Sequence, residues 1–190
     1  IDLNKYENVL KISDEYSEGK FFESGIMIDG IVFHYNVDSI KEDIFSLKEV
    51  IEKAKSYNDF DLKEYLVTDE KLEKWKYLKG GKRIERKTKE GHSYIYSEGN
   101  MAFPENMEEP ARTLLTSEGT TNRSSHIIYD NKQKKYRTLT EIECEIIQMF
   151  PPNWTDTMPK RNRYFMMGNA LVTGIISRLE PTLKKIIENE

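Results

Sequence analysis

Ten residues between positions 112 and 125 carry side chains that can recognise a nucleic acid. In the stretch "EEPARTLLTSEGTTNRSSHII", arginines supply guanidinium forks for guanine edges or phosphates, and short hydroxyls and amides allow close backbone approach. Gly119 lets the chain turn tightly between them. A polar surface loop without a ligand would have the same composition. The ten residues of this polar segment (residues 112–125) are Arg112, Thr113, Thr116, Ser117, Thr120, Thr121, Asn122, Arg123, Ser124 and Ser125.

The distribution of charge indicates the same kind of ligand. Residues 71–138 hold 15 Lys and Arg against 9 Asp and Glu, whereas residues 1–70 hold 8 against 17. A basic middle within a chain of net charge −4 is typical of a face that binds a polyanion. Solvated lysines on helices and hairpins are the alternative interpretation. A cluster upstream of the polar segment consists of Lys82, Arg83, Arg86, Lys87 and Lys89.

The residue types do not form a self-sufficient catalytic site. Cys144, the single cysteine, lies between Glu143 and Glu145 on an apolar stretch, where burial and adjacent carboxylates raise a thiol pKa and disfavour a nucleophilic thiolate. There is no Walker loop and no Gly-x-Gly-x-x-Gly motif. We therefore expect no catalytic residue and no metal ligand. The histidines, none of which is paired at metal-ligand spacing, are His34, His92 and His126.

Hydrophobic alternation predicts the strands that position these residues. Residues 20–37 indicate a β-hairpin that turns at Asp29-Gly30, and residues 82–99 indicate a second hairpin that turns near residues 89–91. The expected fold class is α+β, a small mixed domain with short antiparallel strands and peripheral helices. Further short strands are expected over residues 112–116, 125–129 and 134–139.

Apolar periodicity and capping residues predict the helices. Ser39 and Glu42 form a capping box that would begin a helix reaching about residue 57, with Ile40 and Ile44 in its apolar stripe. A second helix is expected from Thr68 to Lys79, ended by Gly80.

Two more helices are expected near the C-terminus. One begins at the Thr140–Glu143 capping box and stops at Pro151. The last would begin with Gly168-Asn169-Ala170 and continue as an amphipathic helix, kinked or broken at Pro181. Asn169 would cap this helix, or a cofactor or another chain would press against its start.

Composition restricts the class of protein. The chain of 190 residues is 37% hydrophobic and 33% charged, which suits one soluble domain, or a small domain with an appendage. No apolar run approaches the ~18 residues that a membrane span needs, and no signal peptide is visible. One cysteine excludes an internal disulfide and fits a reducing cytoplasm. A start at Ile1 rather than Met suggests a piece of something longer, or processing.

Two late motifs carry a family resemblance. The run "RTLTEIECEIIQMFPPNWTD", followed by "RYFMMGNALV", resembles the C-terminal end of DNA cytosine-5 methyltransferases. In that family an Arg-x-Leu-Thr-x-x-Glu helix ends in Gln-Gly-Phe-Pro, Trp-Thr follows, and an Arg-Tyr-x-x-x-Gly-Asn-Ala/Ser helix closes the chain; these are its sequence blocks nine and ten. Arg112-Thr113-Leu114 resembles the Thr-Leu signature of its target-recognition domain. The motifs cover about residues 111–172.

The chain also departs from the family pattern. Met149 replaces a usual glycine, Pro152 a common aspartate, and Glu141 a frequent proline. The Pro-Cys nucleophile, the Glu-Asn-Val block, the Gln-Arg-x-Arg block and the Phe-x-Gly-x-Gly cofactor loop are absent. Cys144 follows Glu143 rather than proline and cannot replace the nucleophile.

The resemblance implies a division of the chain and a set of partners. Residues 1–138 would be a DNA target-recognition domain, and residues 139–190 a helical segment returning to a Rossmann-like catalytic domain that this chain lacks. Gly168, Asn169 and Ala170 match positions that touch S-adenosylmethionine, which would bind only with the catalytic domain present. The partner would be double-stranded DNA, and no membrane. The implied DNA-binding residues are Arg83, Arg86, Lys87, Lys89, Arg112, Thr113, Leu114, Ser117, Glu118, Gly119, Asn122, Arg123, Ser124 and Ser125.

The expected function is therefore sequence recognition for a DNA cytosine-5 methyltransferase of restriction–modification type. The complete enzyme would flip a cytosine out of the duplex and attack its carbon 6 with a thiolate. This chain would be a fragment or the smaller subunit of a split enzyme, inactive alone. A stand-alone DNA-binding module is the main alternative. A purely structural interaction protein is a third, which explains an apolar helix face but not the hydroxyl-rich segment.

Overall fold

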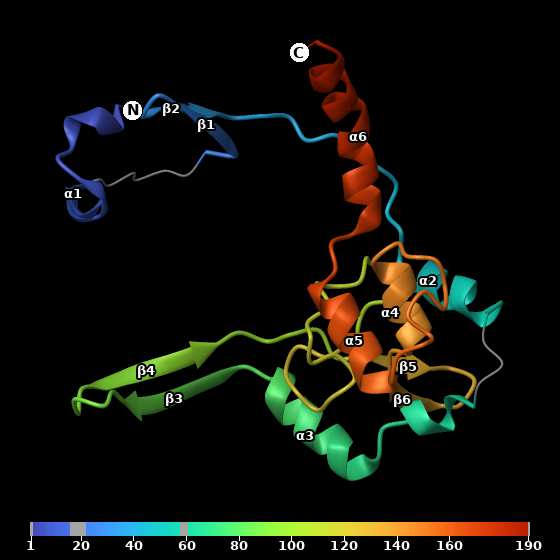
Figure 1. The fold of residues 1–190 in the computed structure, drawn as a ribbon. Coiled ribbons are helices and arrows are strands. Elements are labelled where there is room, and N and C mark those ends of the chain that lie inside the picture. Colours follow the sequence, from blue (N-terminus) through green and yellow to red (C-terminus); the bar gives the residue numbers. More distant parts are fainter. Residues whose placement is uncertain (1, 16–21, 58–60, 190) are drawn as a thin grey trace. The chain divides into compact units, whose positions relative to one another are not determined.

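The computed structural model describes residues 2–15, 22–57 and 61–189. The chain divides into two units, Ile1–Asp43 and Ile44–Glu190 (Figure 1). Helices and two-stranded antiparallel sheets are mixed along the chain, so the predicted α+β class is confirmed at this level. Both sides of the expected boundary between residues 138 and 139 fall inside the second unit, and that functional boundary stays a prediction.

Unit 1 is built around the predicted first hairpin. Strand β1 (Ser24–Ile28) pairs antiparallel with β2 (Ile31–Tyr35), and both turn residues have positive φ, 50° at Asp29 and 77° at Gly30, as a type I′ turn requires. A 3₁₀ turn, η1 (Leu3–Lys5), contacts this turn, and helix α1 (Val9–Glu15) follows. None of the described residues of unit 1 is buried.

Unit 2 begins with a helix that starts later than predicted. Helix α2 (Leu47–Lys55) begins at a capping box formed by Ser46 and Glu49. The predicted box at Ser39 and Glu42 is wrong, because residues 36–46 are not helical and Ile40 is 90% exposed. The later start is fixed by tertiary contacts: the Leu47 and Lys48 N–H groups donate to the carbonyls of Glu109 and Met107, both at 2.9 Å.

The next two predicted elements are present. After the 3₁₀ turn η2 (Leu62–Tyr65), helix α3 (Asp69–Lys79) is capped by Thr68, whose side chain accepts from the Lys71 N–H, and ends at Gly80. Strands β3 (Lys82–Lys87) and β4 (Ser93–Glu98) then form an antiparallel ribbon, here called the basic hairpin (residues 82–98). In Figure 1 this ribbon projects from the end of α3, away from the helices of unit 2.

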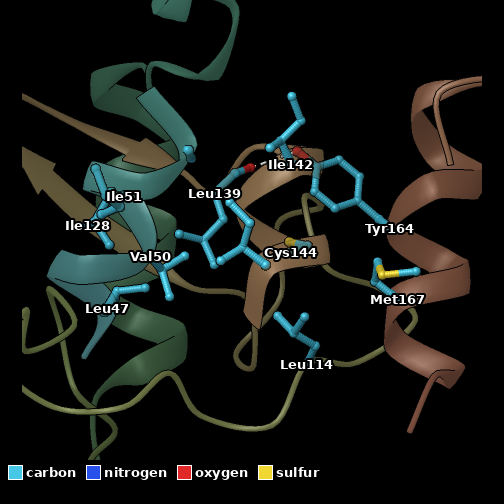
Figure 2. Close-up of a cluster of buried hydrophobic side chains, with 12 residues drawn as sticks. Leu47, Val50, Ile51, Leu114, Ile128, Leu139, Ile142, Cys144, Tyr164 and Met167 are labelled. Carbon is cyan, nitrogen blue, oxygen red and sulfur yellow. Dashed lines mark hydrogen bonds between the residues drawn. The ribbon is translucent and has the colours of Figure 1, made fainter. Parts of the chain in front are cut away.

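The core of unit 2 lies between three helices and the last sheet. Strands β5 (Ile127–Asp130) and β6 (Lys135–Thr138) lie near the predicted ranges and pair antiparallel. Helix α4 (Glu141–Ile147) follows, with both hydrogen bonds of the Thr140–Glu143 capping box present. Figure 2 shows α4 side chains between those of α2 on one side and of helix α5 (Lys160–Asn169) on the other, with Leu114 entering from an irregular segment.

The predicted strand over Arg112–Thr116 is wrong. Residues 111–115 have no regular secondary structure and no partner strand. The stretch is instead held by its side chains, because Leu114 is 2% exposed in the core and Arg112 is bound by a carboxylate. These side-chain contacts hold the backbone of residues 111–115 without the hydrogen bonds of a partner strand.

The Gly-Asn motif ends a helix rather than beginning one. Gly168 and Asn169 are the last residues of α5, and the next helix, α6 (Thr173–Glu188), begins after three residues of irregular chain. The predicted capping role of Asn169 is therefore wrong: its Nδ2 donates to the Phe165 carbonyl one turn earlier, at 3.0 Å. Helix α6 runs unbroken through Pro181. No helix in the described ranges is long and apolar enough to cross a membrane.

Candidate nucleic-acid interface

Arg112, the first arginine of the polar segment, is bound inside the protein. Its Nε and Nη2 donate to the two carboxylate oxygens of Glu105 at 3.0 and 2.6 Å, and Nη2 also donates to the Ser124 carbonyl at 3.1 Å. Glu105 is buried and also accepts from buried Lys79 Nζ at 3.1 Å. The guanidinium fork is thus occupied by a protein carboxylate.

Burial and pairing perturb all three groups. Burial alone would raise the pKa of Glu105, but the hydrogen bond from Arg112 and the charge of Lys79 outweigh it, so its pKa lies below the ordinary value. Burial lowers the pKa of Lys79. The hydrogen bond to Glu105 raises the pKa of Arg112. The two cations share the single buried carboxylate of Glu105, so the carboxylate is paired, as burial of a charge requires.

Arg123, the second arginine of the segment, holds the root of the basic hairpin. Its Nη1 donates to Glu98 Oε2 at 2.8 Å and to the Leu78 carbonyl at 2.9 Å, and its Nη2 donates to the Gly99 carbonyl. Lys82 Nζ reaches the same Glu98 oxygen at 3.1 Å. These contacts connect the polar segment, the end of α3 and both strands of the hairpin.

Short polar side chains of the segment satisfy its own backbone. The Asn122 Oδ1 accepts from the N–H groups of Ser124 and Ser125, and its Nδ2 donates to the Ser117 carbonyl at 2.9 Å. Ser125 Oγ donates to the Thr120 carbonyl at 2.6 Å. The polar segment is therefore a self-bonded loop with a defined backbone path.

Glu118 and His126 form a buried pair where the segment meets β5. Both are at most 3% exposed, and Glu118 accepts from the His126 backbone N–H at 2.8 Å and lies 2.9 Å from its Nδ1. Glu118 therefore anchors the loop to the sheet.

Two glycines allow the polar segment to lie directly on α5. Gly119 has φ +77°, and a Cβ there would lie 2.9 Å from Cδ2 of Tyr164. A Cβ on Gly168 would lie 2.6 Å from the Leu115 carbonyl oxygen and closer still to the Leu115 carbonyl carbon and the Thr116 nitrogen. Since real Cβ contacts are rarely below 3.4 Å, both positions require glycine.

The cations of the basic hairpin other than Lys82 are available to a ligand. Arg83, Lys87 and Lys89 are exposed, and their side chains make no hydrogen bond or ion pair with any residue that the structure describes. Arg86 is exposed as well, with its guanidinium carbon 3.7 Å from the ring centroid of Tyr96 in a cation–π contact.

A model of the family described as C-5 cytosine-specific DNA methylase matches residues 7–185. The chain belongs to this family. It is 42% identical over 179 residues to the type II methyltransferase M.Sau3AI of Staphylococcus aureus, an alignment that covers 94% of this chain and 41% of that protein. The chain thus spans about two-fifths of the length of this curated relative. No solved structure matches it.

In this chain the residues that match the family's ninth block have a structural role. Arg137 donates to both oxygens of Glu143, at 2.8 and 2.6 Å, and Glu143 also accepts from the Thr140 N–H at 2.8 Å. Leu139 between them is fully buried. The Arg-x-Leu-Thr-x-x-Glu pattern is therefore a buried ion pair combined with a helix cap. Gln148 has a structural role as well. Its Nε2 donates to the Met167 carbonyl at 2.7 Å, which connects block nine to α5.

The sequence indicated Arg112 and Arg123 as candidate site residues but not the carboxylates that bind them. Glu105 and Glu98, which bind the two arginines of the polar segment, were not among the candidates, and no local signal identifies them.

Within the described residues, no group of three or more His, Cys, Asp and Glu could hold a metal ion.

The predicted site residues divide into two classes in the structure. Leu114, Glu118 and Ser125 are buried, and Arg112, Asn122 and Arg123 are bonded within the protein. Thr113, Ser117 and the hairpin cations are exposed. Contacts of either class with DNA stay predictions.

The Gly-Asn motif fits only part of a cofactor site. The space beside Gly168 is filled by the Leu115–Thr116 backbone, so this glycine is explained without a cofactor. Asn169 is exposed and Ala170 half-exposed at the turn before α6. These two residues could line one wall of a site for S-adenosylmethionine, with the remaining walls supplied from outside this chain.

Proposed function

We propose that this chain is the target-recognition and C-terminal part of an S-adenosylmethionine-dependent DNA cytosine-5 methyltransferase of restriction–modification type. The proposal depends above all on the family match over residues 7–185 in a chain whose single cysteine is buried. The catalytic part would be joined in cis or bound as a separate subunit, and double-stranded DNA would be the substrate. The relative's name as a type II methyltransferase supports the assignment.

The environment of Cys144 supports inactivity of the chain alone. Its side chain is 0% exposed, and burial, with carboxylates nearby, raises its thiol pKa well above the ordinary value. A thiolate nucleophile needs access and a low pKa. The nucleophile would therefore come from the catalytic part.

The apolar face of α6 supports a partner of that kind. Six large apolar side chains along this helix are between 48 and 71% exposed, and a contiguous apolar patch of this sort marks an interaction surface. We assign this face to packing on the catalytic part. The six are Ile175, Ile176, Leu179, Leu183, Ile186 and Ile187.

In the assembled enzyme, Asn169 and Ala170 would form one wall of the cofactor site. The exposed carboxamide of Asn169 can hydrogen-bond a polar group, and the small side chain of Ala170 leaves room beside it. When bound, S-adenosylmethionine supplies the methyl group. The role of these residues is to bind and orient it.

The first experiment is to read the gene upstream of the codon for Ile1. A continuous frame encoding a Pro-Cys block and a Phe-x-Gly-x-Gly loop would assign the catalytic part in cis. A separate upstream frame with those blocks would assign a split enzyme. If neither lies nearby, the stand-alone DNA-binding module becomes the better hypothesis.

The second experiment is a methyl-transfer assay. We expect this chain alone to transfer no tritiated methyl group to unmethylated duplex DNA, and the chain combined with the upstream-encoded part to do so. Asn169→Ala should weaken cofactor binding by the assembled enzyme, with Asn162→Ala, an exposed asparagine on α5, as the control. Unchanged methylation kinetics for Asn169→Ala would refute its assignment.

A further inference from the structure

We infer that one face of the basic hairpin reads base edges in the major groove of DNA. The inference rests on the proposed function and deepens it, because it assigns base reading to the face of Arg83, Glu85 and Lys87. The arginines of the polar segment then have an internal, structural role.

The strand register separates the hairpin into two faces of different chemistry. Directly opposed residues of an antiparallel pair share a face. Arg83 pairs with Ser97, Glu85 with Ile95 and Lys87 with Ser93, and these six side chains form one face, here called the reading face. The opposite face carries Lys82, Ile84 and Arg86 against Glu98, Tyr96 and Tyr94.

The reading face is open and its charged groups are uncommitted. All six of its residues are exposed. The side chains of Arg83, Glu85 and Lys87 make no hydrogen bond or ion pair with any residue in the described part of the chain. Arg112 and Arg123 differ in this respect, since their guanidinium groups are bound to Glu105 and Glu98 at 2.6 to 3.0 Å. A base contact by either arginine would first have to break its charge-assisted hydrogen bonds to that carboxylate, which costs free energy.

The opposite face stiffens the ribbon and fixes its root. Arg86 stacks on Tyr96, and the Tyr96 hydroxyl donates to Glu98. Glu98 also binds Lys82 and Arg123, and Lys82 Nζ donates to the Leu78 carbonyl at the end of α3, at 2.9 Å. The reading face therefore projects from a rigid base, which lowers the entropic cost of ordering it on a ligand.

The dimensions and side-chain types suit B-form DNA. Strands of six residues extend roughly 20 Å at ~3.3 Å per residue, and the major groove, about 12 Å wide, admits a two-stranded ribbon. Arginine pairs with guanine, glutamate accepts from the cytosine amino group, serine bonds either, and an apolar side chain contacts the thymine methyl. The net positive charge of the hairpin complements the phosphates that border the groove.

The test uses the full chain and a library of duplexes with a randomised core. The wild-type chain is expected to enrich a defined word, which sequencing of bound duplexes reads out. Arg83→Ala and Glu85→Ala should each lose discrimination at one or two base pairs, by about 5- to 150-fold in relative affinity, the range of one good base contact. Lys74→Ala, which removes an exposed charge on α3, should leave the word unchanged. Thermal melts check that each variant is folded.

Every outcome bears on the inference. Loss of discrimination in the two reading-face variants, with the control unaffected, supports it. The same word with wild-type affinity in both variants overturns it and leaves the proposed function intact. A uniform loss for all sequences also overturns it, because it marks phosphate contacts instead. If the wild-type chain enriches no word, the proposed recognition role fails and the inference fails with it.

Discussion

Replacing Gly168 with alanine tests how the polar segment is held on α5. Gly168 lies in a helix without positive φ, so alanine should favour the backbone conformation by up to about 1 kcal/mol. The new methyl group, however, would lie 2.6 Å from the Leu115 carbonyl oxygen, where ordinary contacts begin at 3.4 Å. The two effects act in opposite directions.

The steric cost of the new methyl group should exceed the gain in helix propensity, because both contacting backbones are anchored. Leu114 and Met167, next to the two contacting backbones, are each 2% exposed in the same core, and the Met167 carbonyl accepts from Gln148. Overpacking of an anchored site costs about 1–3 kcal/mol. Because the new methyl group meets backbone atoms rather than a movable side chain, the upper end of this range applies. Subtracting a helix gain of about 1 kcal/mol from a cost of about 3 kcal/mol leaves an expected net loss of about 2 kcal/mol in the free energy of unfolding of unit 2.

Urea denaturation followed by tryptophan fluorescence measures this loss directly. Trp75 is buried and Trp154 is 62% exposed, and both belong to unit 2. With a slope of ~2 kcal/mol per molar urea, the midpoint should fall by about 1 M.

Gly174 provides the matched control. It lies in the first turn of α6, and a Cβ there would lie 2.7 Å from Met149 Cε and closer still to Met149 Sδ, both in the outer part of a flexible, half-exposed side chain that can move. Gly174→Ala should therefore range from neutral to a gain of about 1 kcal/mol. A Gly168→Ala midpoint at or above that of the wild type would show that the Leu115–Thr116 backbone moves freely and refute the reasoning.

Three further outcomes follow from buried groups. Arg137→Met should cost about 3–5 kcal/mol, because it leaves the buried Glu143 carboxylate unpaired; adding Glu143→Gln should recover part of this, as a double-mutant cycle by urea denaturation would measure. The lowered pKa of Glu105 contributes stability that is present above its ordinary value of 4.5 and is lost as the pH falls through the folded pKa; denaturation at a series of pH values should show this loss, and Glu105→Gln should reduce it. Cys144 should resist iodoacetamide at about pH 8 in the folded chain and react in urea, whereas rapid labelling of the native protein would contradict its burial.

Elements whose signals lie within a few residues could be predicted from the sequence. Asp29-Gly30 specifies its turn through backbone conformation alone, and Thr140 with Glu143 forms a cap within one helical turn. Thr68 and Gly80 bound α3 for the same reason. The family's ninth and tenth blocks were recognisable because they, too, are short and contiguous.

The start of α2 depended on distant residues and was predicted wrongly. Ser39–Glu42 and Ser46–Glu49 have the same capping spacing, and the sequence alone does not distinguish them. The carbonyls of Met107 and Glu109 fix the start of α2 at Leu47, because they accept hydrogen bonds from the first N–H groups of the helix.

The state of the candidate site was hidden for a similar reason. Composition indicates that Arg112 and Arg123 can bind DNA, but not that Glu105 and Glu98 already bind them. Glu98 lies 25 positions from Arg123, so this pairing exists only in the folded chain. The hairpin, by contrast, could be placed from alternation alone, and its open reading face follows from the register.

The contact between Gly168 and Leu115–Thr116 limits how new specificities can be obtained from this scaffold. Helix α5, which carries the family's most C-terminal motif, contacts the backbone of the polar segment. The side chains of the polar segment can therefore be changed more easily than its backbone conformation. Exchange of the whole of residues 112–125 between relatives should succeed only if the donor segment places its backbone against Gly168 as Leu115 and Thr116 do. Exchange of the basic hairpin alone, at its root near Gly81 and Gly99, leaves this contact untouched and is the more tolerant route to a chimera.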